Sequence, residues 1–115
     1  MSADNANTAG VRHPVVVQKW EESERGWGCR PDGYSIHATE ADREKFIAAY
    51  WDLMPSIPPH EYSRPCGKPY IADVGEVEWR LLQVALEHGR FGTRMFNNVY
   101  PGDGGTDGWM KGAKL

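Results

Sequence analysis

Apolar and polar positions near the start of the chain follow patterns that are typical of β-strands. The β-branched run Val15 to Val17 favours a first strand. Apolar and polar residues then alternate over residues 34–38, the period of a half-buried strand. Between them, Pro31-Asp32-Gly33 has the composition of a tight turn, preceded by a short strand at residues 26–30. Residues 14–38 therefore predict an antiparallel three-stranded meander.

The pattern then changes to the period of an amphipathic helix. Thr39 is a good N-cap, and Asp42 stands at the capping-box position three residues later. The helix must end before Pro55. We expect a helix over residues 40–54, with one apolar face formed by Phe46, Ile47, Tyr50, Trp51 and Met54.

A proline-rich segment separates this helix from the rest of the chain. Residues 55–69 contain five prolines and predict a long ordered loop. A fourth strand is expected at residues 70–74, and a second helix at residues 76–88 with Gly89 as its C′ residue. Residues 90–100 are compatible with a last strand.

The second predicted helix is apolar on two sides. One face carries Val77, Leu81, Val84 and Ala85, and the other carries Trp79, Leu82 and Leu86. Because a small domain can bury only one such face in its own core, the pattern predicts a homo-oligomer. We expect a charged residue at Trp79 or Leu82 to give monomers or insoluble protein.

These elements predict one small α+β domain, in which an antiparallel β-meander packs with two α-helices. The domain is expected over residues 14–100. A flexible N-terminal tail is expected over residues 1–13, which lack periodicity, and a Gly-rich C-terminal tail over residues 101–115.

Charge and hydropathy narrow the classes of function. The chain has 115 residues and a net charge of -3, without a long basic run, so nucleic acid is not an expected partner. It contains no apolar run of about 20 residues and no hydrophobic signal region, so we expect no membrane partner and a cytoplasmic location. There, Cys29 and Cys66 should be reduced thiols.

No complete catalytic, metal or cofactor motif is present, and we predict no catalytic residue, metal ligand or cofactor. Potential zinc ligands lack the close pairs that zinc sites use; they are Cys29, His37, His60 and Cys66. Asp103 and Asp107 resemble the start of a calcium loop, but Lys114 stands where the bidentate glutamate belongs. Cys29 with His37 across the predicted hairpin remains an alternative as a nucleophile and its base, although a buried thiol is commoner.

Arginine and aromatic residues form the pattern with the most chemical content. The arginines lie in expected turns, at strand ends and after the second helix; they are Arg25, Arg30, Arg64, Arg90 and Arg94. Guanidinium groups suit phosphate oxygens, and nearby aromatic rings suit purine bases. Asn97 and Asn98 offer amides that can read a base edge. The same residue types also build protein interfaces, so both kinds of partner stay open.

One block of the sequence resembles a known family. It runs from Trp20-Glu21-Glu22-Ser23-Glu24-Arg25-Gly26-Trp27-Gly28 through Arg30-Pro31-Asp32-Gly33-Tyr34-Ser35 to Asp42-Arg43. This block resembles small phage and prophage proteins, in particular the phage anti-Thoeris proteins that sequester cyclic ADP-ribose signals. The resemblance covers residues 20–45.

The resemblance implies an oligomeric, non-enzymatic protein that holds a nucleotide between subunits by aromatic stacking and arginine–phosphate contacts. Within the matched block it points to Arg30 as a ligand contact, and residue type and place add Phe91, Arg94 and Asn97. The first hypothesis is therefore a phage anti-defence protein that sequesters a cyclic nucleotide without catalysis. The alternative is a protein–protein inhibitor of a host defence enzyme, similar in action to an anti-CRISPR protein.

Overall fold

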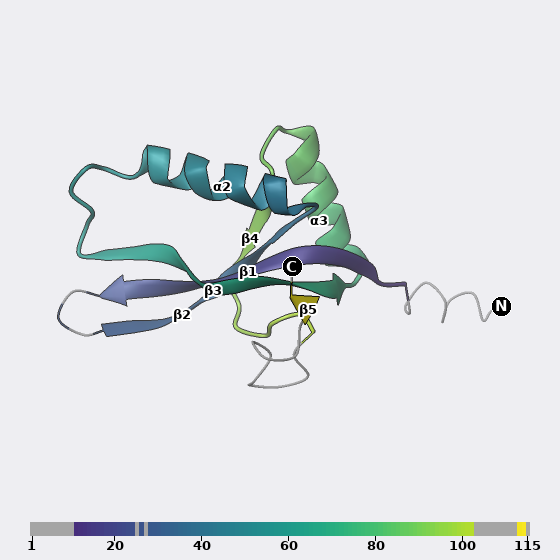
Figure 1. The fold of residues 1–115 in the computed structure, drawn as a ribbon, viewed down its shortest axis with the longest axis horizontal. Coiled ribbons are helices and arrows are strands. Elements are labelled where there is room, and N and C mark those ends of the chain that lie inside the picture. Colours follow the sequence, from purple (N-terminus) through teal and green to yellow (C-terminus); the bar gives the residue numbers. More distant parts are fainter. Residues whose placement is uncertain (1–10, 25, 27, 103–112, 115) are drawn as a thin grey trace.

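The described part of the chain forms a five-stranded antiparallel sheet with two helices. The computed structural model describes residues 11–24, 26, 28–102 and 113–114, and Figure 1 shows their path. The order of the strands in the sheet is β4-β2-β1-β3-β5. The elements are β1 (His13–Glu24), β2 (Gly28–His37), α2 (Glu40–Leu53), β3 (Glu61–Val74), α3 (Glu76–Glu87), β4 (Thr93–Met95) and β5 (Ala113–Lys114). The predicted α+β class is confirmed.

Strand β1 lies in the centre of the sheet, and residues 14–38 belong to two strands, β1 and β2, in place of the three predicted. β1 pairs along one edge with β2 and along the other with β3. Residues 15–20 are buried on both faces of the sheet, with at most 5% of any residue exposed. Because both faces of this strand are covered, successive side chains on either face are buried, which explains the uninterrupted valine run.

The Pro31-Asp32-Gly33 triplet is part of β2 and does not form the predicted turn. The pairing passes from Lys19–Tyr34 to Glu21–Pro31, so that Asp32 and Gly33 together oppose a single residue of β1. This is a β-bulge, and Gly33 adopts a φ of +77° within it. A side chain at Gly33 would also collide with the backbone of β4. The Pro-Asp-Gly composition that predicts a turn therefore forms a β-bulge here.

Strand β3 begins at Glu61, where a loop was predicted up to residue 69. It pairs with β1 from Glu61 to Val74 with one register shift, and among the described residues its outer edge pairs with β5 alone, at Tyr70 and Ile71. Pro65 and Pro69 lack an N–H donor, but an edge strand tolerates them because its outer groups need no partner in the sheet.

The two predicted tails are only partly described. Residues 1–10 and 103–112 lie outside the described part of the chain, so the predicted flexibility there is untested. His13 already belongs to β1, and Ala113–Lys114 of the predicted C-terminal tail join the sheet as β5.

Both predicted helices are confirmed. The Thr39 hydroxyl accepts a hydrogen bond from the Asp42 N–H at 3.0 Å and so caps α2. Gly89 follows α3 with a φ of +74°, the left-handed conformation expected of a C′ residue. Within the described part of the chain, neither helix has the length and apolar character needed to cross a membrane.

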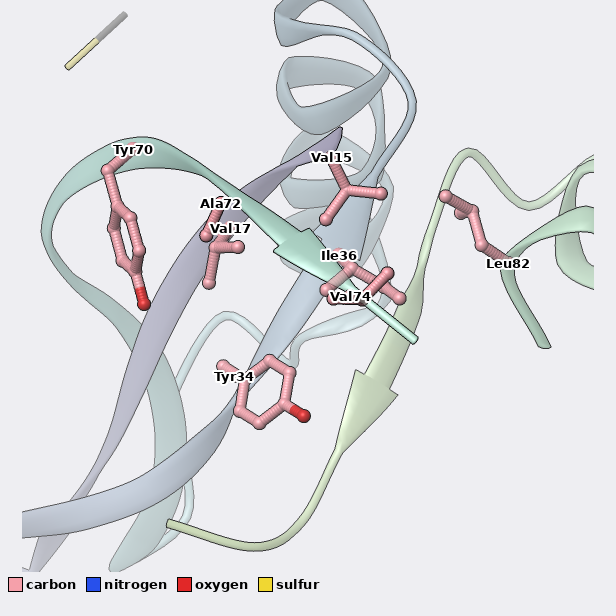
Figure 2. Packing of buried hydrophobic residues seen from close by; sticks show 8 residues of the cluster. All are labelled: Val15, Val17, Tyr34, Ile36, Tyr70, Ala72, Val74 and Leu82. Atoms are coloured by element: carbon pink, nitrogen blue, oxygen red, sulfur yellow. The ribbon is translucent and has the colours of Figure 1, made fainter. Parts of the chain in front are cut away.

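The two helices pack against opposite faces of β1. On one face, Leu82 of α3 meets residues from three strands in the hydrophobic cluster drawn in Figure 2, namely Val15, Val17, Tyr34, Ile36, Tyr70, Ala72 and Val74. On the other face, Phe46 and Tyr50 of α2 make edge-to-face contacts with the buried Trp20 ring. No residue of α2 is fully buried, so this second layer is the thinner one.

The inner side of α3 is the one that carries Trp79, Leu82 and Leu86. Leu82 is fully buried, and Trp79 and Leu86 pack against the same cluster. Trp79 and Leu82 therefore pack in the core of the single chain, so insoluble protein is the expected result of a charged residue at either position, and the homo-oligomer stays a prediction. Three apolar residues of the other face point to solvent: Val77, Leu81 and Val84 are 71%, 46% and 52% exposed.

Candidate functional site

A cleft lies between α2 and the segment that joins α3 to β4. Its volume is about 380 Å³, near the lower end of the range typical of small-molecule sites. Most of its lining is apolar or aromatic, and two arginines complete it. The lining residues are Phe46, Ala49, Tyr50, Leu53, Gly89, Arg90, Phe91 and Arg94.

Arg94 is a mostly buried cation in the wall of this cleft. Its guanidinium carbon lies 4.3 Å from the centre of the Trp20 ring and 4.6 Å from that of Phe96. Nη2 donates a hydrogen bond to the Asp32 carbonyl at 2.8 Å, and the Asp32 carboxylate lies 3.4 Å away. Burial lowers the pKa of Arg94, while the nearby Asp32 favours its charged form. Among the described residues, its buried Nε finds no hydrogen-bond acceptor.

Phe91 is held at the mouth of the cleft by its backbone. It has a φ of +50°, an unusual value for a residue other than glycine. Its carbonyl accepts a hydrogen bond from His37 Nδ1 at 2.9 Å. On the solvent side, the Lys45 ammonium lies 5.2 Å from the centre of the Phe91 ring. The backbone of Phe91 is therefore tied to the core, and a cation lies near its ring.

A chain of buried hydrogen bonds connects Phe91 to the middle of the sheet. Trp20 Nε1 lies 2.8 Å from Ser35 Oγ, and Ser35 Oγ lies 2.7 Å from His37 Nε2. Because the Phe91 carbonyl can only accept, Nδ1 of His37 carries the proton and Nε2 accepts from the serine hydroxyl. Burial lowers the pKa of His37 to about 4, which keeps the ring neutral. The direction of every bond in the chain is thus fixed.

Ser35 and His37 have the spacing of a nucleophile and its base, but neither reaches solvent. Both residues are 0% exposed, so a substrate has no access to the hydroxyl. The alternative pairing of Cys29 with His37 does not form either. The Cys29 thiol is exposed and accepts a hydrogen bond from Arg64 at 3.0 Å, while both nitrogens of His37 are engaged elsewhere.

Arg30 lies apart from the cleft, on the exposed end of β2. Its Nη2 lies 2.6 Å from the Glu22 carboxylate and 2.9 Å from that of Glu24. The hydrogen bond that Arg30 donates to Glu22, together with the charges of both glutamates, raises the pKa of Arg30. Glu61 brings a third carboxylate, with its oxygen within 4.8 Å of the other two. The structure therefore does not bring Arg30 together with Phe91 and Arg94.

Asn97 is exposed and also does not line the cleft. Its Oδ1 accepts a hydrogen bond from the Val99 N–H at 3.0 Å. The neighbouring Asn98 accepts from the Gly33 N–H at 2.9 Å, which ties the end of β4 to the bulge in β2. These two amides hold local backbone in place.

Two of the residues that line the cleft, Phe91 and Arg94, were predicted from the sequence as ligand contacts, and the other lining residues were not. Phe46 and Tyr50 are on the apolar face predicted for α2, but nothing in the sequence shows that this face stays partly open. Arg90 stood among the candidate arginines without being chosen. The role of His37 has no sequence signal, because its partners lie two and 54 residues away.

Taken together, the lining of the cleft offers aromatic rings for stacking and cations for an anion. No known protein family, curated protein or solved structure gives a significant match to this chain. The chemistry of the cleft and the resemblance of residues 20–45 are therefore the two grounds on which a function can be argued.

Proposed function

We propose that the protein binds a cyclic nucleotide of the cyclic ADP-ribose type and sequesters it without turnover. The observation that carries this proposal is the convergence of three aromatic residues with Arg90 and Arg94 in one cleft of about 380 Å³. In this view the protein acts in the host cytoplasm as a phage anti-defence protein, withholding a signal from the enzyme that reads it.

The aromatic part of the cleft supports recognition of a base. Phe46, Tyr50 and Phe91 come from two segments of the chain that face each other across the opening. Stacking of a base on one such ring contributes about 1–3 kcal/mol to binding and accepts any base. The hydrogen bond between the Phe91 carbonyl and His37 holds the backbone of Phe91 in place, which reduces the backbone entropy lost on binding.

The cations support recognition of phosphate. Arg90 is exposed beside the cleft, and Lys45 lies against the Phe91 ring. A guanidinium can hold two phosphate oxygens at once, and an ammonium adds a second charge. Arg94 contributes a positive field from within the wall.

The composition of the lining supports capture without turnover. General acid–base or nucleophilic catalysis needs a carboxylate, imidazole, hydroxyl or thiol within reach of the reacting atom. Of the residues that line this cleft, only Tyr50 carries such a group, and its hydroxyl donates to the Ser63 carbonyl. A bound nucleotide would therefore be held beside groups that bind but do not attack.

Calorimetric titration tests this function. The protein should bind at least one ligand from a set of cyclic ADP-ribose, cyclic mononucleotides and cyclic dinucleotides, and release it chemically intact on denaturation. Arg90→Gln should weaken binding by more than about tenfold, as expected for a lost charge-assisted contact. Arg30→Gln is the matched control, because Arg30 is an exposed arginine outside the cleft. A larger loss from Arg30→Gln would favour the ligand contact that the sequence predicts.

A second candidate function rests on the surface at the end of α2, which adjoins the cleft at Leu53. Leu53 and Ile57 are large, exposed apolar residues near the end of α2, with the half-exposed Trp51 beside them in the sequence. Exposed apolar clusters of this kind mark protein-binding sites, so the alternative is inhibition of a host defence enzyme through this end of the molecule. If the parent chain binds none of the nucleotides, and Ile57→Asp, which lies outside the cleft, abolishes its effect on a defence enzyme, this second function replaces the first.

A further inference from the structure

His37 is a buried residue of β2 that contacts both walls of the cleft from behind. On the α2 side, its ring meets the Phe46 ring edge to face, with the ring centres 5.0 Å apart. On the opposite side, its Nδ1 donates a hydrogen bond to the Phe91 carbonyl at 2.9 Å. Because His37 is 0% exposed and does not line the cleft, it can act on a ligand there only through these two residues.

The chain at Phe91 and Gly92 is shaped to receive the His37 ring. Phe91 has a φ of +50°, a conformation that a residue with a side chain rarely adopts. A Cβ atom at Gly92 would collide with the His37 ring, so a glycine is needed for the ring to approach this closely. The hydrogen bond to the Phe91 carbonyl therefore stabilises an unusual backbone conformation at the mouth of the cleft.

The orientation of the His37 ring is set by its second nitrogen as well. Nε2 accepts a hydrogen bond from the Ser35 hydroxyl at 2.7 Å, and Ser35 Oγ in turn accepts one from the Trp20 indole at 2.8 Å. If the ring turned over, carbon atoms would replace both nitrogens at these positions, and both of its hydrogen bonds would be lost. The ring therefore presents its Nδ1–H to Phe91 in one orientation.

We propose that His37 is a positioning residue for ligand binding: it holds the Phe91 backbone and packs against the Phe46 ring, so that the two walls of the cleft are in place before a ligand enters. This inference rests on the proposed function, since it assigns His37 a part in binding. A residue of this kind raises affinity without touching the ligand, because walls that are already ordered lose less entropy on binding.

Two variants of His37 with nearly the same shape separate the hydrogen bond from the packing. Asparagine has an amide that can donate from the position of Nδ1, whereas leucine has a similar branched shape without a donor. Neither side chain reaches the position of Nε2, so both variants lose the acceptor of the Ser35 hydroxyl alike. Gly92→Ala, whose added methyl group presses against the His37 ring, is a further variant in case His37→Leu does not fold.

Calorimetric titration with cyclic ADP-ribose tests the effect on binding, at a temperature where circular dichroism shows each variant to be folded. His37→Leu should weaken binding by more than about tenfold, and Gly92→Ala should also weaken it, whereas His37→Asn should stay within about threefold of the parent. Val74→Ala is the stability control, because it truncates a buried residue in the cluster on the α3 face and should destabilise the fold without changing the affinity. The proposal is wrong if His37→Leu binds like the parent, or if His37→Asn or Val74→Ala loses as much affinity as His37→Leu.

Nuclear magnetic resonance of the free protein tests the positioning without a ligand. The Lys45 ammonium lies 5.2 Å from the centre of the Phe91 ring, so the parent should show Overhauser cross-peaks between these two side chains. The cross-peaks should persist in His37→Asn and disappear in His37→Leu. Cross-peaks that are absent from the parent, or that persist in both variants, overturn the proposal. If they behave as expected but the parent binds no nucleotide, the proposed function fails and the positioning of Phe91 by His37 stands.

Discussion

The two halves of β1 show how differently one strand can be held in place. From Val15 to Trp20 the strand is buried on both faces, between α3 on one side and α2 on the other. From Glu21 to Glu24 it is only partly buried, and its carboxylates pair with arginines of the flanking strands. The buried half includes Trp20, whose indole is connected to the cleft residue Phe91 by the hydrogen bonds of Ser35 and His37.

This contrast indicates where the stability of the fold resides. Burial of a large apolar side chain contributes several kcal/mol, whereas an exposed ion pair typically contributes less than about 1 kcal/mol. The half of β1 from Glu21 to Glu24, which forms ion pairs, should therefore contribute less to the stability of the fold than the buried half. Substitutions in the two halves should differ accordingly.

Trp20→Ala should have the largest effect. It removes a fully buried indole that contacts Phe46, Tyr50 and Arg94, and such truncations cost about 3–5 kcal/mol. Denaturant unfolding followed by circular dichroism measures this loss. Trp51→Ala is the comparison, because Trp51 is 40% exposed and should cost much less. Equal losses would show that the centre of β1 is not the anchor.

A fall in pH should lower the stability of the fold, because His37 is buried as a neutral imidazole. Burial sets the pKa of His37 in the folded chain at about 4, below the value of 6.5 expected when unfolded. Between these values only the unfolded chain takes up the proton, so stability is complete above about pH 6.5 and falls as the pH drops towards 4. The loss should approach about 3 kcal/mol. His37→Gln should flatten this part of the pH profile, while His60→Gln, at an exposed site, should leave it unchanged.

Gly92→Ala should have an intermediate effect. A Cβ atom there would collide with the ring of His37 and lie 2.8 Å from the Ile36 carbonyl. Such overpacking costs about 1–3 kcal/mol and should also displace Phe91. Thermal unfolding measures the loss of stability. A transition like that of the parent would mean that the segment between α3 and β4 moves to accommodate the added methyl group.

Arg30→Ala should have the smallest effect on folding. Its ion pairs with Glu22 and Glu24 are exposed to solvent, so water and salt ions replace them readily. The thermal unfolding curve should superimpose on that of the parent, at low and at high salt. A clear loss of stability at low salt would show that the exposed half of the sheet contributes more than its burial indicates.

Local signals in the sequence predicted the helices, whereas the strands depended on distant partners. Thr39 and Gly89 define helix ends through their own backbone and side-chain chemistry. In contrast, Pro31-Asp32-Gly33 and residues 55–69 have the composition of turns and loops. The triplet enters β2 as a bulge opposite β1, and residues 61–69 enter β3 because they pair with β1.

The cleft was predictable only in part for the same reason. Phe91 and Arg94 lie close in sequence, and their residue types alone indicated a ligand. Phe46 and Tyr50 reach the same cleft from 40 or more residues earlier, through the packing of α2 on Trp20. Arg30, indicated by the resemblance, lies in a region of the sheet whose contacts are with glutamates.

The most direct test of the ligand cleft is a calorimetric comparison at Phe91. Phe91→Leu keeps an apolar side chain but removes the aromatic face, whereas Phe91→Tyr retains the ring. With the best-bound cyclic nucleotide, we expect Phe91→Leu to lose more than about tenfold in affinity and Phe91→Tyr to bind like the parent. If the parent binds no nucleotide, or if Phe91→Leu binds as tightly as the parent, the cleft is not the nucleotide site.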